Sequence, residues 1–279
     1  MSFLSTATVN YKSRIERAEL LTSRHAFAKE VLRFYLALAR FQGEFYSELP
    51  KLWGKQPRVP SNGNLRGQLN LPILVQPLRK FLAAVESTGP GPVAAEARTW
   101  AHGSQDKWSK ALEEFWANGM QQAAGGDSAD PLNEFMARAF LLPYAEFLVS
   151  GMLPPALPMA VCRCPRCGSL PLLGVLRPEG DGGKRYLQCS FCSQEWEFRR
   201  ILCAQCGEEA ESKLPVFIAQ EFSHIRVECC DTCKHYLRTM DLTKDGNAVP
   251  LVDDLAAIPL TLWAEQNGYK RIQSNLLGT

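Results

Sequence analysis

All ten cysteines of this 279-residue chain lie between Cys162 and Cys233, and eight of them form four Cys-x-x-Cys pairs. The pairs are Cys164 with Cys167, Cys189 with Cys192, Cys203 with Cys206, and Cys230 with Cys233. Two thiolates separated by two residues can bind one metal ion from a single tight turn, and a second pair about twenty residues later completes a tetrahedral all-sulfur site. The unit occurs twice in succession. The sequence therefore predicts two metal ions per chain, each held by four cysteines.

The two four-cysteine units look like an internal repeat. A glycine follows the second cysteine in both units, at Gly168 and Gly207, which suits a turn whose backbone needs a positive φ. An arginine stands four residues before the third predicted ligand in both units, at Arg185 and Arg226.

This register decides which cysteines are the predicted ligands. It selects Cys230 rather than its neighbour Cys229, and it leaves Cys162 outside the first pair. Buried thiols are the favoured interpretation of the two remaining cysteines, because free cysteine is among the most buried residue types. A role for them as alternative ligands stays open.

A disulfide scaffold is the main alternative to metal binding. Against it, the N-terminus shows no basic stretch followed by an apolar one, as a secretory signal would. Disulfide-rich domains are usually short secreted chains, whereas half of this chain has no cysteine. A thioredoxin-like site needs one Cys-x-x-Cys at the start of a helix in a βαβ frame, which the sequence does not show. Thiolate ligands require a reducing compartment, so we expect the protein in the cytoplasm.

The native metal does not follow from the cysteine spacing. Zinc and iron both accept tetrahedral all-sulfur coordination, as in zinc ribbons and rubredoxin. Zinc would make the two sites purely structural. Iron in the same arrangement could be redox-active and sensitive to oxygen.

Composition is typical of a soluble protein of about two domains, with 46% hydrophobic and 22% charged residues. No apolar run reaches the roughly 18–20 residues that a membrane-spanning helix requires. Residues 161–240 contain 11 Lys and Arg against 10 Asp and Glu, and eight thiolates with two divalent ions would make this region acidic. Modules that bind nucleic acid are normally strongly basic, so nucleic acid is a disfavoured partner.

Residues 1–155 are predicted to form an α-helical bundle. Asp130 and Pro131 suit the N-cap and first turn of a helix, whereas Pro77 is expected to delay a helix and Pro143 to end or kink one. Apolar residues recur at helical spacing in four stretches, and each stripe predicts one buried face. The stripes are Val31, Phe34, Leu38, Phe41 and Phe45; Leu74, Leu78, Phe81 and Val85; Trp108, Leu112, Phe115 and Trp116; and Phe135, Ala139 and Leu142.

Residues 156–240 are predicted to form a tandem metal-ribbon domain, which follows a proline-rich connector at 152–158. A first rubredoxin-like or zinc-ribbon module is expected over about 160–198 and a second over about 199–240. Short β strands are expected at 174–177, 184–188, 214–218 and 225–228. Ribbons of this kind bury little apolar area, so metal binding must supply much of their folding free energy, on the order of 10 kcal/mol per site.

Residues 241–279 are predicted to form a C-terminal helical segment, with a helix over 253–266 that Pro259 splits. Its expected apolar face consists of Leu255, Ile258, Leu262 and Trp263. The predicted fold class is therefore α+β: a helical bundle, two tandem four-cysteine modules and a C-terminal helix.

Catalysis finds little support in the sequence. The chain has no Gly-x-Ser-x-Gly, no phosphate-binding glycine loop and no His-Glu-x-x-His. The four histidines, His25, His102, His224 and His235, stand beside no nucleophile pattern, and ordinary solvated histidine is favoured for each. A closed four-cysteine site also leaves no coordination position for a substrate. We expect a protein that is not an enzyme and has no catalytic residues.

Several segments resemble the formate dehydrogenase accessory protein family FdhE. The resemblance covers roughly residues 130–276 well and the first helices only loosely. Two of its segments are Cys164-Pro-Arg-Cys-Gly-Ser-Leu-Pro171 and Cys230-Asp-Thr-Cys-Lys-His-Tyr-Leu237. The others are 185–196, 200–206, 253–263 and Asp130-Pro-Leu with Pro143-Tyr144, whereas Cys162 and Cys229 have no counterpart in the family pattern.

The resemblance implies a cytoplasmic assembly factor rather than a catalyst. Members of such a family help to mature respiratory formate dehydrogenase and contact its molybdenum- or tungsten-containing catalytic subunit before twin-arginine export. The family pattern associates the cysteine pairs with iron in a rubredoxin-like setting, and all eight cysteines are present here. Two alternatives remain: a rubredoxin-like redox protein, and a zinc-ribbon factor that binds nucleic acid.

Overall fold

The computed structural model describes residues 9–54, 64–118, 130–150, 152, 158–180 and 182–279. The chain divides into two compact units, Met1–Leu153 and Pro154–Thr279. Most of the predicted connector lies outside the described residues, which include only Met152 and Pro158 of it. The predicted domain boundaries at 155 and 240 concern which parts of the chain fold independently, and they stay predictions.

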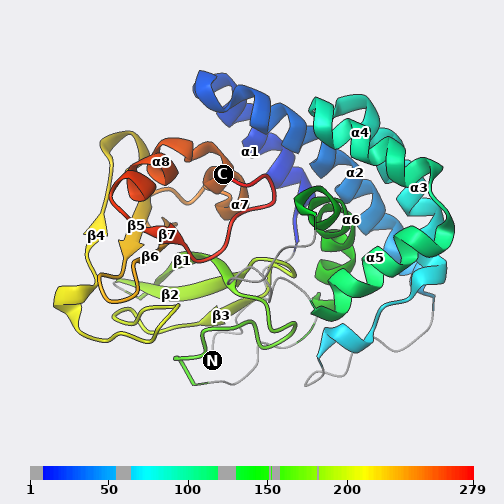
Figure 1. Ribbon diagram of the computed structural model, residues 1–279. Helices are drawn as coiled ribbons and strands as arrows, with labels where there is room; N and C mark the ends of the chain where they lie inside the picture. The colour runs from blue at the N-terminus through cyan, green and yellow to red at the C-terminus, as the bar shows by residue number, and fades with distance from the viewer. Residues whose placement is uncertain (1–8, 55–63, 119–129, 151, 153–157, 181) are drawn as a thin grey trace. The chain divides into compact units, whose positions relative to one another are not determined.

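Unit 1, Met1–Leu153, is helical in its described part (Figure 1). Two short 3-10 helices, η1 (Ala26–Ala28) and η2 (Leu65–Gly67), accompany longer α-helices. The α-helices are α1 (Tyr11–Arg24), α2 (Lys29–Trp53), α3 (Leu71–Thr88), α4 (Gly91–His102), α5 (Gln105–Asn118) and α6 (Pro131–Val149).

The predicted apolar stripes lie on α2, α3, α5 and α6, and most of their residues are buried. Val31, Phe115 and Phe135 are half-buried. Asp130 caps α6 as expected, because its side chain accepts a hydrogen bond from the Leu132 backbone N–H at 3.0 Å.

The expected delay of a helix at Pro77 and the expected end of one at Pro143 were wrong. Helix α3 begins at Leu71 and contains Pro77, and α6 continues through Pro143 to Val149. A proline inside a helix removes one backbone hydrogen bond, but burial of the flanking apolar residues opposes that loss.

The described part of unit 2, Pro154–Thr279, contains one seven-stranded mixed sheet with two α-helices. The strand order is β3-β2-β1-β6-β5-β4, and β7 also pairs with β6. The strands are β1 (Pro171–Glu179), β2 (Gly182–Cys189), β3 (Glu195–Glu197), β4 (Val216–Phe217), β5 (Ile225–Cys229), β6 (His235–Asp241) and β7 (Lys270–Arg271). The helices are α7 (Pro250–Ala256) and α8 (Ile258–Gln266), with 3-10 turns η4 (Glu211–Lys213) and η5 (Gln220–Phe222).

The α+β prediction is confirmed, and the sheet adds a feature that the sequence did not indicate. Strands β1 to β3 of the first module and β4 to β6 of the second are each antiparallel, and a parallel pairing of β1 with β6 joins them into one sheet. Gly174 lies opposite Thr239 at this junction, and a Cβ atom there would collide with the Thr239 side chain. The two modules therefore share backbone hydrogen bonds.

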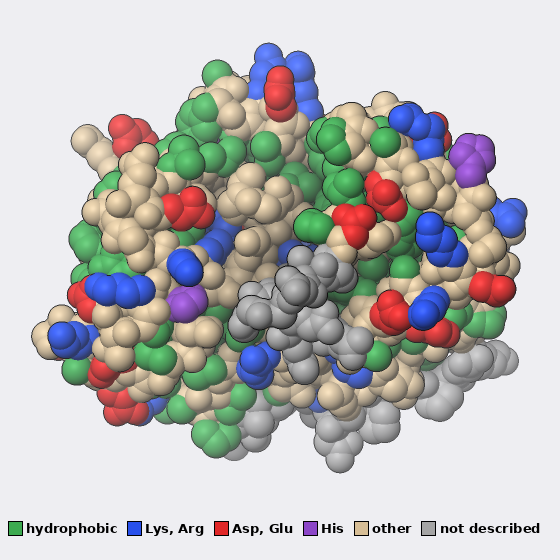
Figure 2. Space-filling model, viewed as in Figure 1, with side chains coloured by type: hydrophobic (Ala, Val, Ile, Leu, Met, Phe, Trp, Pro, Cys, Tyr) green, Lys and Arg blue, Asp and Glu red, His purple; other side chains and the backbone are tan. Residues whose placement is uncertain are grey.

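The helices α7 and α8 lie within the predicted C-terminal segment, and Ala257, close to Pro259, separates them. Residues of α8 and the turn before it, among them Leu260 and Ala264, pack against β5 and β6 in one core cluster. Leu262 was expected in the core but is 54% exposed. Charged side chains of both signs are interspersed over the face shown in Figure 2.

Candidate metal centres

Each of the four Cys-x-x-Cys pairs lies in a tight turn before, between or after strands of the sheet. The first turn precedes β1, the second joins β2 to β3, the third follows β3, and the fourth joins β5 to β6. In every turn the N–H of the first cysteine donates to the carbonyl oxygen five residues later. The donor and acceptor residues are Cys164 and Ser169 (2.8 Å), Cys189 and Gln194 (2.9 Å), Cys203 and Glu208 (2.9 Å), and Cys230 and His235 (2.9 Å).

The residue after the second cysteine has a positive φ in all four turns. The predicted glycines have φ of 74° at Gly168 and 77° at Gly207. The equivalent positions in the other two turns are Ser193, with φ 55°, and Lys234, with φ 56°. The fold thus repeats one turn geometry four times, and the sequence places glycine at only two of these strained positions.

We expect Gly207→Ala to destabilise unit 2 by about 1 kcal/mol, because a side chain with positive φ is strained. A Cβ atom at this position meets no other atom within 4 Å, so the cost is conformational and not steric. Gly182→Ala is the matched control, since its Cβ is equally unobstructed and its φ is not positive. Denaturant unfolding at fixed metal content measures the free energy of unfolding of both variants. Equal stability of the two variants would contradict this account.

The eight predicted cysteines come together as two groups of four, and no other described residue belongs to either group. In site 1, made by Cys164, Cys167, Cys189 and Cys192, two cross-pair Sγ–Sγ distances are 3.5 and 3.3 Å. In site 2, made by Cys203, Cys206, Cys230 and Cys233, the corresponding distances are 3.8 and 3.7 Å.

The sulfur spacings of site 2 match those of a tetrahedral thiolate site, and those of site 1 are somewhat shorter. A Zn–S bond of about 2.3 Å implies sulfur atoms about 3.8 Å apart. Backbone N–H groups also approach the sulfurs, from Arg166 to Cys164 at 3.4 Å and from Phe191 to Cys189 at 3.3 Å. Such hydrogen bonds stabilise thiolates and orient them. Two metal sites are consistent with this arrangement. The ligand role of each cysteine stays a prediction.

The two sites differ in their access to solvent. Every cysteine of site 1 is buried, and none is more than 3% exposed. In site 2, Cys206 is exposed and Cys233 is half-buried, whereas the other two are buried. One side of site 2 therefore faces solvent, although the donor sets are chemically identical.

The two arginines of the repeat form ion pairs that connect strands of the sheet. Arg185 donates to the carbonyl oxygen of Arg199 at 2.8 Å and forms an ion pair with Glu228 at 2.6 Å. It thereby connects β2 with β5 and with the segment that leads into the third cysteine turn. Arg226 forms an ion pair with Asp241 at 3.0 Å. The sequence identified both arginines by their register but gave no indication of these partners.

The two remaining cysteines belong to neither site, as the register predicted. Cys229 lies in the core between β5 and α8, and burial raises the pKa of its thiol to about 12. Cys162 is half-buried, and its Sγ lies 3.7 Å from the carbonyl oxygen of Ala160.

None of the four histidines joins either cysteine group. His224 Nε2 lies 2.9 Å from an Asp253 carboxylate oxygen, and His235 Nδ1 lies 2.8 Å from the Cys233 carbonyl oxygen. His25 packs against Phe27, and His102 is exposed at the end of α4. The expectation of ordinary solvated histidines thus holds for His102 but not for His25, His224 and His235, which are half-buried.

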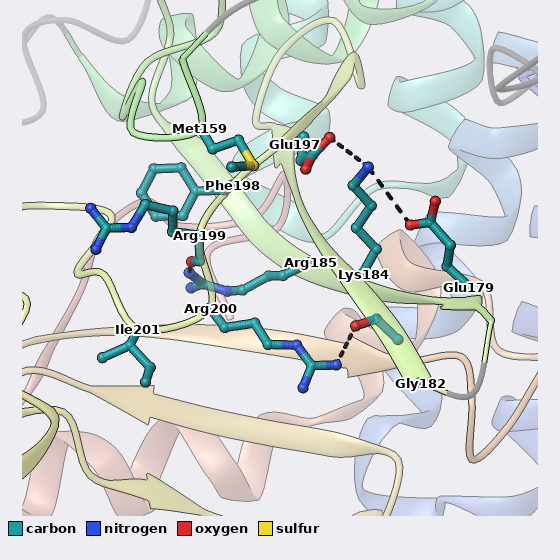
Figure 3. A pocket seen from close by; sticks show the side chains of 11 residues that line it. Met159, Glu179, Gly182, Lys184, Arg185, Glu197, Phe198, Arg199, Arg200 and Ile201 are labelled. Atoms are coloured by element: carbon teal, nitrogen blue, oxygen red, sulfur yellow. Dashed lines mark hydrogen bonds and ion pairs between the residues drawn. The ribbon is translucent and has the colours of Figure 1, made fainter.

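A cavity of about 690 Å³ lies beside the start of β2 and the segment 197–201 (Figure 3). Lys184 lies between Glu197, at 2.7 Å, and Glu179, at 3.7 Å. Arg200 donates to the Gly183 carbonyl oxygen. Most cations of this cavity therefore have carboxylate partners, and the lining holds no cysteine or histidine.

Comparison with known proteins identifies the family. The model described as "FdhE, central domain" matches residues 163–200, and "FdhE, C-terminal domain" matches residues 187–277. The "Protein FdhE homolog" of Pseudomonas putida is 29% identical over 99% of this chain and 89% of the relative. This chain belongs to the FdhE family.

One further FdhE relative matches part of this chain in sequence, and another matches it in fold. The "Protein FdhE homolog" of Aquifex aeolicus is 37% identical, and this match spans 41% of either chain. The crystal structure of the FdhE protein from Pseudomonas aeruginosa has a TM-score of 0.73 at 24% identity and covers 99% of both chains. This likeness shows the shared fold.

Among the described helices, none is both long and apolar enough to span a membrane.

Proposed function

We propose that this protein is a cytoplasmic maturation factor for a respiratory formate dehydrogenase and binds the catalytic subunit of that enzyme through unit 2. The observation that carries this proposal is the FdhE family match, which is concentrated in the region of the two four-cysteine sites. The same match makes a role in assembly better supported than one in nucleic-acid binding.

The eight cysteines would serve this function by holding the sheet in its binding-competent form. Each site joins a turn before a module's first strand to a turn further along the same module. A bound ion would supply folding free energy on the order of 10 kcal/mol per site. Four thiolates close the coordination sphere, so the sites offer no position at which a substrate could react.

We expect Cys189→Ser to abolish capture of the formate dehydrogenase catalytic subunit. Loss of this buried ligand leaves three thiolates around the ion and loosens the attachment of β2 to β1. The measurement is co-purification of the catalytic subunit with tagged protein from anaerobically grown cells, together with formate dehydrogenase activity. Cys162→Ser is the matched control, because it removes a thiol that belongs to neither site.

Full enzyme activity in a strain whose only copy lacks both sites would refute the proposal. The already matured enzyme should keep its turnover after withdrawal of the accessory protein.

One specific observation favours a second function: the exposed Cys206 would give iron at site 2 access to an electron donor. Normal capture with lost activity in the Cys206→Ser variant would favour that redox role.

A further inference from the structure

Four of the six large apolar side chains exposed in the described part of unit 2 lie together at β4 and α8. They are Val216 (50% exposed), Phe217 (38%), Ile218 (49%) and Leu262 (54%). The rings of Phe217 and Trp263 are 4.6 Å apart between centroids, so α8 contacts β4 through Trp263, and Leu262 is the exposed neighbour of Trp263 on α8. These five residues form what we call the β4 edge surface. Exposed apolar clusters of this kind mark interaction sites in soluble proteins.

The backbone of β4 is open on one side. β4 is the last strand of the sheet and, among the described residues, pairs only with β5 (Figure 1). The Cys229 N–H donates to the Pro215 carbonyl oxygen at 2.9 Å, so Pro215 lies at a hydrogen-bonded position of this antiparallel pair. Hydrogen-bonded and non-hydrogen-bonded positions alternate along such a pair. The N–H and C=O of Val216 therefore point away from β5, where they can bind a further strand.

Three exposed carboxylates flank the β4 edge surface. Glu211 and Glu221 border β4 in η4 and η5, and Glu265 lies one helical turn beyond Leu262 on α8. All three are exposed, and none takes part in an ion pair within the described chain. Lys213 is the one exposed cation in the segment 211–221. An apolar strip with this border complements a segment that carries Lys or Arg beside apolar residues.

We propose that the β4 edge surface docks an extended segment of a partner polypeptide, apolar at its centre and bordered by Lys or Arg, as an additional strand on the sheet. Backbone hydrogen bonds to β4 would supply affinity, and contacts with the apolar side chains and carboxylates would supply selectivity. The inference rests on the proposed function for the source of the segment, which is then the formate dehydrogenase catalytic subunit. A second copy of this chain is a poorer occupant, because its edge carries the same acidic border.

The first test uses two synthetic peptides with the same alternating Val and Ile core, one flanked by lysines and the other by glutamates. We expect the lysine-flanked peptide to bind the full-length protein at least about tenfold more tightly, measured by fluorescence anisotropy. Glu221→Lys should weaken that binding, whereas Glu44→Lys, the same change on an exposed face of α2, should not. Absence of binding, equal binding of the two peptides, or dimerisation through this edge instead would overturn the inference.

The second test distinguishes docking at the β4 edge surface from the proposed function in formate dehydrogenase maturation. Val216→Pro removes the outward N–H and leaves the inward bond between Cys229 and Pro215 intact, and proline is tolerated on edge strands when its nitrogen faces solvent. We expect this variant to lose its binding of the lysine-flanked peptide and to capture the catalytic subunit about tenfold less well, while its metal content is unchanged. Ile218→Lys provides a second disruption, with Met159→Lys as the control at a similarly exposed apolar residue.

The outcomes of the second test are distinct. Normal capture by Val216→Pro and Ile218→Lys would overturn the inference and leave the proposed function standing. Failure of the unaltered protein to capture the subunit, with peptide binding at the edge preserved, would instead refute the proposed function and keep the docking edge.

Discussion

A strong chelator is expected to remove one of two metal ions from each chain quickly and the other slowly. In site 2 the exposed Cys206 and the half-buried Cys233 allow an incoming ligand to reach the ion from solvent. In site 1 no cysteine is more than 3% exposed, so release requires local opening of the sheet. If that opening costs more than about 1.4 kcal/mol, the second ion leaves at least tenfold more slowly.

The experiment combines elemental analysis with a chromogenic chelator on anaerobically prepared protein. Iron and zinc together should total two ions per chain, released in two phases of equal amplitude. Cys206→Ser should abolish the fast phase, and Cys167→Ser, the change at the matched position of site 1, should abolish the slow one. Alkylation after the fast phase should label the four cysteines of site 2 and the half-buried Cys162, but no cysteine of site 1. Release of both ions in one phase, or loss of the fast phase in Cys167→Ser, would contradict the assignment.

The grouping of the cysteines was predictable because its chemistry is local. Each Cys-x-x-Cys pair needs one tight turn, and the arginine four residues before the third ligand of each unit, Arg185 or Arg226, fixed the register that excluded Cys229. The difference in burial between the two sites was not predictable, because both have the same spacing of ligands. Burial depends on which strands and loops pack over each turn.

The apolar stripes predicted the helices α2, α3, α5 and α6 for a similar reason, since a helix displays its periodicity within one short segment. Strand β6 was missed because its sequence does not alternate cleanly. It contains Arg238, which is fully buried and paired with Asp254 at 2.8 Å. A charged residue in a sequence suggests solvent, and only its partner, distant along the chain, permits burial.

Long-range pairing also explains the other differences. The union of two modules in one sheet depends on the parallel contact of β1 with β6, between segments more than fifty residues apart. Leu262 satisfied a helical stripe, yet α8 packs on the sheet through Leu260 and Ala264. A stripe shows that a helix has an apolar face but not which part of that face the sheet covers.

The largest single loss of stability in unit 1 is expected from Glu146→Ala. Glu146 on α6 is fully buried and pairs with Arg14 on α1 through oxygen–nitrogen distances of 2.6 and 3.2 Å. The Tyr11 hydroxyl donates to the same carboxylate at 2.6 Å. Burial opposes the charge on Arg14, but the carboxylate of Glu146 more than offsets this and raises the pKa of Arg14.

Removal of Glu146 leaves a buried guanidinium and a buried hydroxyl without their acceptor, which costs about 3–5 kcal/mol. Such a loss is a large share of the stability of an ordinary domain, which is about 5–15 kcal/mol. Glu48→Ala is the matched control. It breaks the exposed pair with Lys80, at 3.1 Å, and should cost no more than about 1 kcal/mol. The double variant Arg14→Met with Glu146→Leu should recover much of the loss, because it leaves no charge unpaired.

The measurement is denaturant unfolding of the full chain, followed by helical circular dichroism and by metal content in parallel. If unit 1 folds independently, Glu146→Ala lowers the midpoint of the helical transition while both ions stay bound, since the helical unit contains none of the eight cysteines. Conversely, chelation should leave most of the helical signal in place. Joint loss of helix and metal in one transition would show that the two units fold as one, and the predicted boundary near residue 155 would then be wrong.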